Sequence, residues 1–432
     1  MRTILMSISL GRYCRILTLS GVGDLLLKRP DTRLVILSPA AHLQAFRDRI
    51  GLRGDVVFED LPDYSPAATR LQRALRRLLT ATWRHKGIFL PCMRVYESVQ
   101  AMQEPRLFDG IFRRYEPSVV VTASPGFNSP REIPLIGEAR RAGIPTLYVA
   151  YGWDSLTVPV KGFMPARPAA LAVWNRFMKQ EAVECHHYDP GAVKIVGPPH
   201  FDIYQDKTII VPRERFFDRM GLDPEKKVIL FATGTLRWSD NAFILDILEK
   251  AIQNRDLIYP CQVICRMHPF GKGKDRNVYE RFMGSPHVKF DSNFGHIEHL
   301  GWTPDRDDVV HIANLVYHSD VVVNIASTIV LEAALLDRPV VSVGFNPVEP
   351  EKFESMVIKR VFWQHYRYVL EREACSFVEN EEQFIRALND NLSNPALRRD
   401  GRRTLVEDIC YRLDGQASAR VADAILELSE PR

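Results

Sequence analysis

Asn324-Ile-Ala-Ser-Thr-Ile-Val-Leu-Glu332, followed directly by Ala333-Ala-Leu-Leu-Asp-Arg-Pro-Val-Val-Ser342, is the stretch that decides the fold. The apolar run Val321 to Val323 before it predicts a buried strand, and its small polar residues predict a tight turn. A helical pattern follows, Arg338-Pro339 ends it, and a second apolar run begins. Strand, turn, helix and strand form the α/β unit that places a ligand at the carboxyl end of a parallel strand.

Three residues of this stretch are candidates for ligand contacts. Ser327 is a natural N-cap, and Ser327 and Thr328 stand at a helix start, where unpaired backbone amides favour a phosphate. Glu332 faces the mouth one turn into the helix, where a carboxylate accepts hydrogen bonds from ribose or sugar hydroxyls. A plainer alternative stays open: Ser327 only caps the helix, and the helix dipole stabilises Glu332.

The composition is that of an ordinary globular protein with two domains. Of 432 residues, 46% are hydrophobic and 25% are charged, so we expect domains at 1–204 and 205–432, with the C-terminal helix packing back on the first. A net charge of +4 gives little support to a nucleic-acid partner. Seven scattered cysteines indicate reduced thiols and no metal site. His186-His187 resembles a metal pair, but adjacent residues do not share a helix face, so we expect solvated histidines.

Neither a signal peptide nor a membrane span is expected. The segment from Met1 to Ser9 is too short and too polar downstream for a signal peptide. No apolar run reaches the length of about 18 residues that a spanning helix needs. We therefore expect a cytoplasmic protein.

Apolar runs that alternate with helical patterns predict a parallel, doubly wound sheet in the first half. The expected strands are Thr3–Leu10, Leu34–Leu37, Val56–Phe58, Val119–Thr122, Thr146–Ala150, Ala170–Val173 and Val193–Gly197. The expected helices include Arg15–Lys28, Glu132–Ala142 and Asn175–His187. Gly11, after the first strand, is a candidate acceptor-side contact, although a lone glycine there usually marks only a tight turn.

Trp153-Asp154-Ser155 leaves the strand Thr146–Ala150 at its carboxyl end, where open α/β sheets place their chemistry. Asp154 is the candidate general base, with Trp153 and Ser155 beside it on the acceptor side. The alternative, that Asp154-Ser155 only makes an Asx turn, carries equal weight.

The segment Ala67–Lys86 differs in kind from the rest of the first half. Its leucines recur at helical spacing among arginines, and it contains no acidic residue. A basic amphipathic helix of this kind suits contact with a membrane surface or an anionic lipid-linked partner. A surface helix whose leucines dock on the sheet is the alternative, and it is slightly favoured.

The second half repeats the pattern of strands and helices. Strands are expected at Lys227–Ala232, Gln262–Cys265, His287–Phe290 and Val340–Val343, besides the opening stretch. Thr233-Gly234-Thr235-Leu-Arg237 offers amides, hydroxyls and a cation for a phosphate or sugar oxygen. Arg266 and His268 project from the same strand face, and a cation beside an imidazole suits a diphosphate.

Two sheets with their carboxyl edges toward one another predict a cleft, and a cleft between two sites indicates transfer chemistry. No GxxxxGK[ST], GxSxG or HExxH motif is present, which disfavours kinases, esterases and zinc proteases.

These motifs, taken in order, resemble the CDP-glycerol glycerophosphotransferases, which are the teichoic-acid polymerases, and the surface-polysaccharide glycosyltransferases related to them. The resemblance covers about residues 119–345. It rests on the motifs Trp153-Asp154, Lys161-Gly162, Val196-Gly-Pro-Pro199 with Asp202, Ile229–Thr233, Arg266-Met-His-Pro269, and Asp320 through Ser327, Thr328 and Glu332 to Arg338-Pro339. It implies a GT-B fold of two Rossmann-like domains, an N-terminal acceptor side, a C-terminal nucleotide-donor side, no metal in catalysis and no cofactor.

The resemblance also implies roles for individual residues. The family's catalytic histidine falls on Asp154, and its Arg-x-His-Pro histidine falls on His268, which would stabilise the donor's phosphates. Its serine pair falls on Ser327 and Thr328, and Glu332 stands where the family has an aspartate. A carboxylate at position 154 fits an inverting sugar transferase, in which it deprotonates an acceptor hydroxyl.

The sequence therefore predicts a glycosyltransferase that moves a sugar from a nucleotide donor to a surface glycan or a lipid-linked precursor, at the inner face of the membrane. Three alternatives remain. They are a glycerol- or ribitol-phosphate transferase, a sugar-nucleotide 2-epimerase of the same fold, and a non-enzymatic subunit of a polysaccharide machine.

Overall fold

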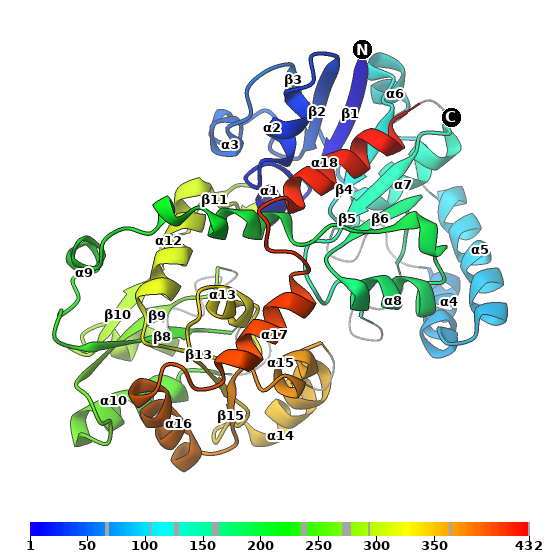
Figure 1. The fold of residues 1–432 in the computed structure, drawn as a ribbon. Coiled ribbons are helices and arrows are strands. Elements are labelled where there is room, and N and C mark those ends of the chain that lie inside the picture. Colours follow the sequence, from blue (N-terminus) through cyan, green and yellow to red (C-terminus); the bar gives the residue numbers. More distant parts are fainter. Residues whose placement is uncertain are drawn as a thin grey trace. The chain divides into compact units, whose positions relative to one another are not determined.

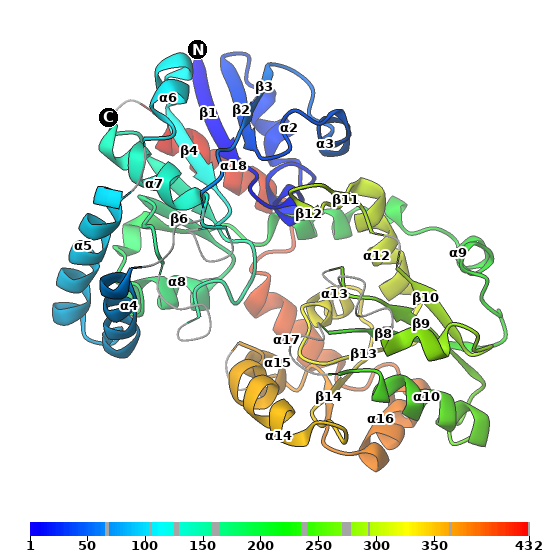
Figure 2. The same cartoon turned by 180° about the vertical axis from the view of Figure 1, so that it is seen from behind.

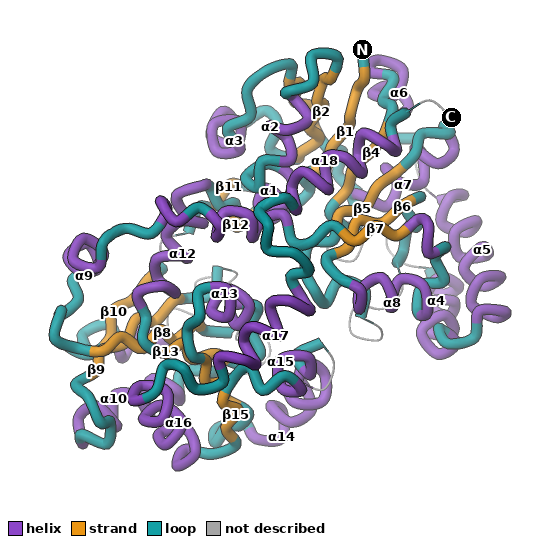
Figure 3. Tube along the Cα trace, viewed as in Figure 1, coloured by secondary structure: helices purple, strands orange, loops and turns teal. Residues whose placement is uncertain are grey.

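The computed structural model describes residues 1–64, 69–103, 106–124, 129–157, 164–234, 240–269, 278–292, 294–362 and 365–430. The chain divides into two compact units (Figure 1). Unit 1 comprises Met1–Gln205, Gly295–Arg306 and Ile409–Arg432; unit 2 comprises Asp206–Phe294 and Asp307–Asp408. Each unit contains one large sheet with helices around it (Figure 3). The predicted fold class, two parallel α/β sheets, is confirmed.

Unit 1 is built on a seven-stranded parallel sheet with the order β3-β2-β1-β4-β5-β6-β7. The strands are β1 (Arg2–Ser7), β2 (Thr32–Ser38), β3 (Val56–Asp60), β4 (Val119–Thr122), β5 (Thr146–Val149), β6 (Ala170–Val173) and β7 (Val193–Ile195). The strand order reverses between β1 and β4. The carboxyl ends of these two strands therefore form a topological switch point, where open α/β sheets bind ligands.

Helices cover both faces of the unit 1 sheet, which is why its strands are continuous apolar runs in the sequence. Ile4 and Met6 of β1 pack on the face that carries α1 (Cys14–Leu17), α2 (Val22–Leu27), α3 (Gln44–Ile50) and α18 (Ala417–Leu428). Leu5 points to the opposite face, which carries α6 (Asp109–Tyr115) and α7 (Glu132–Arg141). The remaining helices of the unit are α4 (Arg70–Thr82), α5 (Lys86–Gln103) and α8 (Arg176–Glu184).

Two segments from late in the sequence complete unit 1. Residues 295–306, which we expected within the second domain, form the small antiparallel ribbon of β11 (His296–Ile297) and β12 (Gly301–Trp302). The ribbon segment is held to α3 by an ion pair of 2.8 Å between Arg49 and Asp305. The second segment carries α18, which lies along the β1–β4–β5 part of the sheet (Figure 1).

Asp202 explains how α18 is anchored. Its two carboxylate oxygens accept hydrogen bonds from the backbone amides of Ala417 (3.1 Å) and Ser418 (2.7 Å). The carboxylate therefore satisfies two amides at the start of the helix from a position about two hundred residues earlier in the chain. The hydroxyl of Ser418 donates to the carbonyl oxygens of Ser20 and Pro199.

Unit 2 contains a six-stranded parallel sheet with the order β10-β9-β8-β13-β14-β15. The strands are β8 (Lys227–Ala232), β9 (Cys261–Arg266), β10 (Val288–Asp291), β13 (Val321–Asn324), β14 (Val340–Val343) and β15 (Ser376–Val378). The helices are α9 (Arg213–Met220), α10 (Phe243–Asn254), α12 (Arg306–His318), α13 (Ile329–Leu335), α14 (Pro350–Phe353), a π-helix (Glu354–Phe362), α15 (Arg367–Glu371), α16 (Glu381–Ser393) and α17 (Arg399–Ile409). Side chains of α10 and α16 pack together against one face of the sheet.

Asp320 joins the amino ends of β8 and β13. Its carboxylate accepts hydrogen bonds from the backbone amide of Val228 (2.8 Å) and from the ammonium group of Lys227 (3.0 Å). This aspartate, which directly precedes β13, is thus a structural clamp at the end of β13 remote from the expected ligand.

Some expected elements differ in detail. The helix expected at Arg15–Lys28 is two short helices, because Gly21 between them adopts a left-handed backbone with φ of 94°. Residues 205–215, which follow the expected domain boundary, contain a 3-10 turn, Lys207–Ile209, and the first turn of α9. None of the helices in the part of the chain that the structure describes is both long enough and apolar enough to cross a membrane.

Candidate functional site

Asp154 follows β5 in a tight turn at the carboxyl edge of the unit 1 sheet. Ser155 makes the turn: its hydroxyl oxygen accepts a hydrogen bond from the amide of Gly152 (3.0 Å), and its own amide donates to the carbonyl of Gly152 (3.1 Å). The Ser155 side chain therefore supplies a hydrogen bond to this turn, and Trp153 is buried beside it.

Gly152 and Tyr148 define the surroundings of the Asp154 carboxylate. A Cβ atom on Gly152 would lie only 3.1 Å from Oδ1 of Asp154, so the absence of a side chain at 152 leaves room for this carboxylate. Tyr148 is buried in β5, and burial raises the pKa of its phenol, with the negative charge of Asp154 adding to the increase. Asp154 itself is half-buried, so its carboxylate lies beside a buried phenol at the sheet edge.

Gly11, which we expected to contact an acceptor, has a packing role. Its amide donates to the carbonyl of Leu300 (3.1 Å), and a Cβ atom at this position would collide with the Thr303 hydroxyl and the Trp302 carbonyl. The residue is buried beneath the ribbon segment 295–306. Glycine is required here for the close approach of two backbones, and this packing role accounts for the residue without a ligand.

Glu132 is the residue at this edge that the sequence analysis did not identify. It is fully buried at the start of α7. Its Oε1 accepts hydrogen bonds from the hydroxyls of Ser7 (3.2 Å) and Ser9 (2.5 Å), and its Oε2 accepts one from the amide of Ser124 (3.2 Å). Ser7 and Ser9 lie at the end of β1, and Ser124 follows β4, so Glu132 occupies the topological switch point.

Burial raises the pKa of the Glu132 carboxyl from 4.5 to about 8, and the three hydrogen bonds only partly offset this rise. Tyr13, also buried, is a neighbour whose pKa burial raises to about 12, with Glu132 contributing to the rise. A carboxyl group poised near neutrality at a switch point is a typical functional-site feature. Its one signal in the sequence is the Ser7-Ile8-Ser9 pair of hydroxyls.

In unit 2, Thr233 follows β8 and connects two of the expected donor loops. Its hydroxyl oxygen accepts a hydrogen bond from the amide of His268 (2.8 Å), and its amide donates to the carbonyl of Arg266 (3.0 Å). These bonds bring Thr233 and His268 together at the carboxyl edge. Gly234 lies beside the buried Asn241. Thr235 and Arg237, as well as Lys161-Gly162 in unit 1, lie outside the described residues.

Arg266 forms an ion pair with a residue of the neighbouring strand. The last residues of β9 and β10 are register partners, and Arg266 Nη1 lies 2.5 Å from Asp291 Oδ2, with both side chains buried. His311 of α12 contacts the other carboxylate oxygen at 3.1 Å, and the guanidinium stacks 4.3 Å from the ring centre of Phe294. Burial acts to raise the pKa of Asp291, but His311 and Arg266 outweigh it and hold the pKa below its ordinary value. Arg266 therefore positions the ends of two strands.

The turn after β13 has a strained backbone. Ala326 adopts a left-handed conformation with φ of 44°, which is unfavourable for a residue with a Cβ atom and is concentrated at functional sites. Helix α13 then begins with Thr328 at the N-cap, and Ser327, which we expected there, accepts a long hydrogen bond of 3.5 Å from the amide of Ile329. Ser327 is half-buried, Thr328 is exposed, and Glu332 is buried in the first turn.

Asn324, the last residue of β13, belongs to a buried polar network. Its side-chain oxygen accepts hydrogen bonds from the hydroxyls of Ser342 (3.3 Å) and Tyr366 (3.1 Å), which lie 2.6 Å from each other. Its side-chain nitrogen is buried and has no partner among the described residues. One amide donor at the carboxyl end of β13 thus remains unsatisfied.

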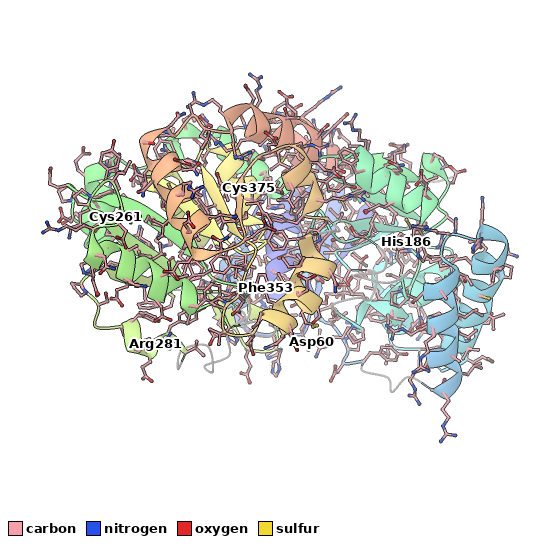
Figure 4. The ribbon with its side chains drawn as sticks, turned by 90° about the horizontal axis from the view of Figure 1, so that it is seen from below. Asp60, His186, Cys261, Arg281, Phe353 and Cys375 are labelled. Atoms are coloured by element: carbon pink, nitrogen blue, oxygen red, sulfur yellow. The ribbon has the colours of Figure 1, made fainter. Side chains whose placement is uncertain are left out.

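Among the described residues, no group of three or more His, Cys, Asp or Glu could hold a metal ion. His186, which we expected to be solvated, is fully buried, and its ring nitrogen contacts the carbonyl of Leu156 at 2.8 Å (Figure 4). Burial lowers its pKa to about 4. The prediction failed because the helix ends at Glu184, and His186 therefore turns inward.

A cavity of about 540 Å³ opens at the other edge of the unit 1 sheet, near Ser118, Thr146 and the end of α18. These residues lie at the amino ends of β4 and β5. Parallel sheets bind their ligands at the carboxyl ends of the strands, so this cavity is not part of the candidate site.

Comparison with known proteins gives a family match over more than half of the chain. Residues 169–427 match the family described as CDP-Glycerol:Poly(glycerophosphate) glycerophosphotransferase. The matched range contains the unit 2 sheet, and it begins after Asp154 and Glu132. No curated protein sequence matches the chain.

Several solved structures share the fold at low sequence identity. A UDP-GlcNAc 2-epimerase from Neisseria meningitidis bound to UDP-GlcNAc has 14% identity and a TM-score of 0.58, with 98% of this chain and 100% of that chain covered. The wall teichoic acid polymerase TagF has 13% identity and a TM-score of 0.57, with 99% and 89% covered. A glycosyltransferase from Rickettsia africae has 13% identity and a TM-score of 0.54, with 99% of each chain covered. These similarities confirm the predicted GT-B architecture.

Proposed function

Since the chain belongs to the CDP-Glycerol:Poly(glycerophosphate) glycerophosphotransferase family, we propose that it is a transferase whose donor is a nucleotide-sugar. The sugar passes to a hydroxyl of a surface glycan or of its lipid-linked precursor, with inversion at the anomeric carbon and without a metal. The observation that carries this proposal is the carboxylate of Asp154, which stands where the resemblance places the family's catalytic histidine.

In the proposed reaction, Asp154 accepts the proton of the acceptor hydroxyl while the hydroxyl oxygen forms a bond to the anomeric carbon. The bond between that carbon and the diphosphate breaks, and the nucleoside diphosphate leaves with the electron pair. The space at Gly152 and the turn hydrogen bond of Ser155 support this role, because the first leaves room for the Asp154 carboxylate and the second fixes the backbone that carries it.

The donor side of the proposal rests on the carboxyl edge of the unit 2 sheet. Thr233 and His268 are joined there by a hydrogen bond, and Ser327 and Thr328 stand at the start of α13. Hydroxyls, an imidazole and helix-start amides suit the negative charge of a leaving diphosphate. Glu332 would accept hydrogen bonds from sugar or ribose hydroxyls.

The sequence indicates that Arg266 contacts a diphosphate, whereas its contacts in the structure favour a positioning role. Its ion pair with Asp291 holds the strand end from which His268 follows. We propose that Arg266 positions His268 and does not itself bind phosphate.

The proposal is tested with purified full-length protein in two steps. Thermal shift with UDP-, GDP-, CDP- and CMP-linked donors identifies the donor, because a ligand that binds only the folded state raises Tm. UDP-sugars are the first choice, since a UDP-GlcNAc-bound protein shares the fold. Asp154→Asn should then lower kcat about 10²- to 10⁴-fold while the donor-induced Tm shift stays unchanged.

The exposed aspartate Asp31 supplies a matched control. Asp31→Asn removes the same charge from the amino-terminal side of β2 and should leave turnover intact. Full turnover in Asp154→Asn would remove the proposed base.

Polyol-phosphate transfer is the second candidate, and the family match favours it. In that case CDP-glycerol or CDP-ribitol would be the donor that raises Tm, and the phosphorus atom would be attacked in place of an anomeric carbon. Product analysis by mass spectrometry separates the two outcomes, because only this reaction adds phosphate to the acceptor.

A further inference from the structure

Helices α4 and α5 form a hairpin at the edge of unit 1, side by side in both views (Figures 1 and 2). Thr69 and Gln72 start α4 with a reciprocal capping box, and three residues separate the two helices. Leu79, Phe89, Met93 and Tyr96 are the buried residues of the small core between the helices. The hairpin is therefore an ordered element with a core of its own.

A second set of apolar side chains on this hairpin faces solvent. Leu71 and Leu78 of α4 are 53% and 42% exposed, and seven residues, two helical turns, separate them. On α5 the same spacing recurs in the exposed residues Ile88 (49%), Val95 (50%) and Met102 (79%). These five residues form an apolar stripe on each helix that the hairpin core does not use.

The hairpin is strongly basic as well as apolar on its exposed surface. Between Thr69 and Tyr96 the chain has seven Lys or Arg residues and no Asp or Glu. The whole protein has a net charge of only +4, so the rest of the chain is net negative. Arg70 and Arg77 are exposed on α4 and form a separate stripe, about 100° around the helix axis from the exposed leucines. Long side chains project outward from both helices (Figure 4).

We propose that the α4–α5 hairpin is a docking surface for an anionic lipid bilayer. Exposed aliphatic side chains flanked by arginines fit the boundary between lipid headgroups and acyl chains. There the aliphatic side chains insert among the acyl chains, and the arginines contact the lipid phosphates. Nucleic acid would use the arginines but not the exposed leucine, isoleucine, valine and methionine side chains. This inference concerns attachment alone, so it stands or falls independently of the transferred group.

The test is co-sedimentation of the full-length protein with vesicles, without donor or acceptor. The protein should bind vesicles of phosphatidylcholine mixed with phosphatidylglycerol, bind phosphatidylcholine alone at least about tenfold more weakly, and dissociate as salt is raised. Arg70→Gln/Arg77→Gln and Leu71→Ser/Leu78→Ser should each weaken binding to the mixed vesicles about tenfold or more.

Matched changes on unit 2 serve as controls. Arg219→Gln/Lys289→Gln removes two exposed charges, and Ile258→Ser/Met283→Ser removes two apolar side chains that are 52% and 45% exposed. Both controls should bind vesicles like the wild type, and circular dichroism establishes that every variant is folded.

Three results would overturn the proposal. The first is equal binding to neutral and mixed vesicles, and the second is unchanged binding in both hairpin variants. The third is a protein dimer that the leucine variant dissociates, without vesicle binding, because the stripe would then be an interface between two copies of the chain.

Discussion

The carboxyl edges of the two sheets share an architecture but differ in electrostatics. At the unit 1 edge, Glu132 is buried without a cation among its hydrogen-bond partners, and Asp154 lies beside the buried phenol of Tyr148. At the unit 2 edge, the buried carboxylate of Asp291 is paired with a guanidinium and an imidazole.

This difference has a chemical meaning. A carboxyl group without a counter-ion has a raised pKa and is suited to proton transfer, whereas a paired carboxylate stays ionised and fixes its neighbours. The same sheet topology can therefore hold a carboxyl group with a raised pKa at one edge and a paired carboxylate with a lowered pKa at the other. The function of each edge depends on a few side chains just beyond the strands, not on the fold.

The largest effect is expected when the buried ion pair at the unit 2 edge is disrupted. Arg266→Met leaves Asp291 buried without its main counter-ion, which should destabilise the protein by about 3–5 kcal/mol. The double variant Arg266→Met/Asp291→Asn removes both charges and should recover much of that loss. Apparent Tm and urea unfolding measure the effect.

The exposed pair Arg281–Asp246 is the matched control for this prediction. Its side chains are 57% and 51% exposed, so Arg281→Met should cost less than about 1 kcal/mol. Equal losses in the two single variants would show that burial of the Arg266–Asp291 pair has no energetic weight.

At the unit 1 edge, the buried Glu132 carboxyl should make the stability of the protein depend on pH. The Glu132 carboxyl has a pKa of about 8 when folded against an ordinary value of 4.5. As pH rises between these values, the unfolded chain releases this proton before the folded protein does, so Glu132 lowers stability across the window, by about 1.4 kcal/mol for each pH unit at most. Glu132→Gln should remove a few kcal/mol of this pH-dependent loss.

Apparent Tm measured from pH 4.5 to about 8 tests the sign and the size of this effect. Glu225→Gln, at an exposed glutamate of unit 2, should retain the wild-type slope. If Glu132→Gln also retains it, the carboxyl group titrates at an ordinary pKa and the contrast between the two edges disappears.

A smaller effect on stability is expected from glycine-to-alanine changes in the loops that follow the first strand of each sheet. Gly11→Ala would place a Cβ atom against the Trp302 carbonyl and the Thr303 hydroxyl, and should destabilise the protein by about 1–3 kcal/mol. Among the described residues, Gly234→Ala meets the Asn241 amide at 3.3 Å and should cost less. Gly110→Ala in α6 meets none of the described residues and should stabilise by up to about 1 kcal/mol. Thermal unfolding of the three variants should follow this order; an equally tolerated Gly11→Ala would contradict the close packing of the ribbon segment.

The strands could be predicted from the sequence because buried parallel strands are continuous apolar runs with few other interpretations. Val119–Thr122 and Val321–Val323 are examples, and each lies in a strand of the structure. Helix α4 was also predictable, because its leucines recur at helical spacing. Gly21 broke the expected Arg15–Lys28 helix through a left-handed backbone, which a single glycine permits but does not require.

The position of a candidate residue was predictable where that residue directly follows its own strand. Asp154 and His268 are such residues. Glu132 was missed, and the Arg266–Asp291 ion pair was not foreseen, because both depend on contacts with distant residues. Glu132 needs Ser7 and Ser9, and Arg266 needs Asp291, which lies in an apparently irregular polar segment of the sequence. Pairings of this kind become visible only when the strand order is known.

The return of the chain to unit 1 has a consequence for synthesis on the ribosome. Val421 and Ile425 of α18 belong to the same core as Ile4 and Met6 of β1, and the amide of Ser418 is bonded by Asp202. The first unit to emerge from the ribosome is therefore the last to be completed, after the residues of unit 2 have all been made. Until the last turns of α18 emerge, the part of this sheet face that α18 covers stays exposed, and we expect the nascent chain to need protection by a chaperone during that interval.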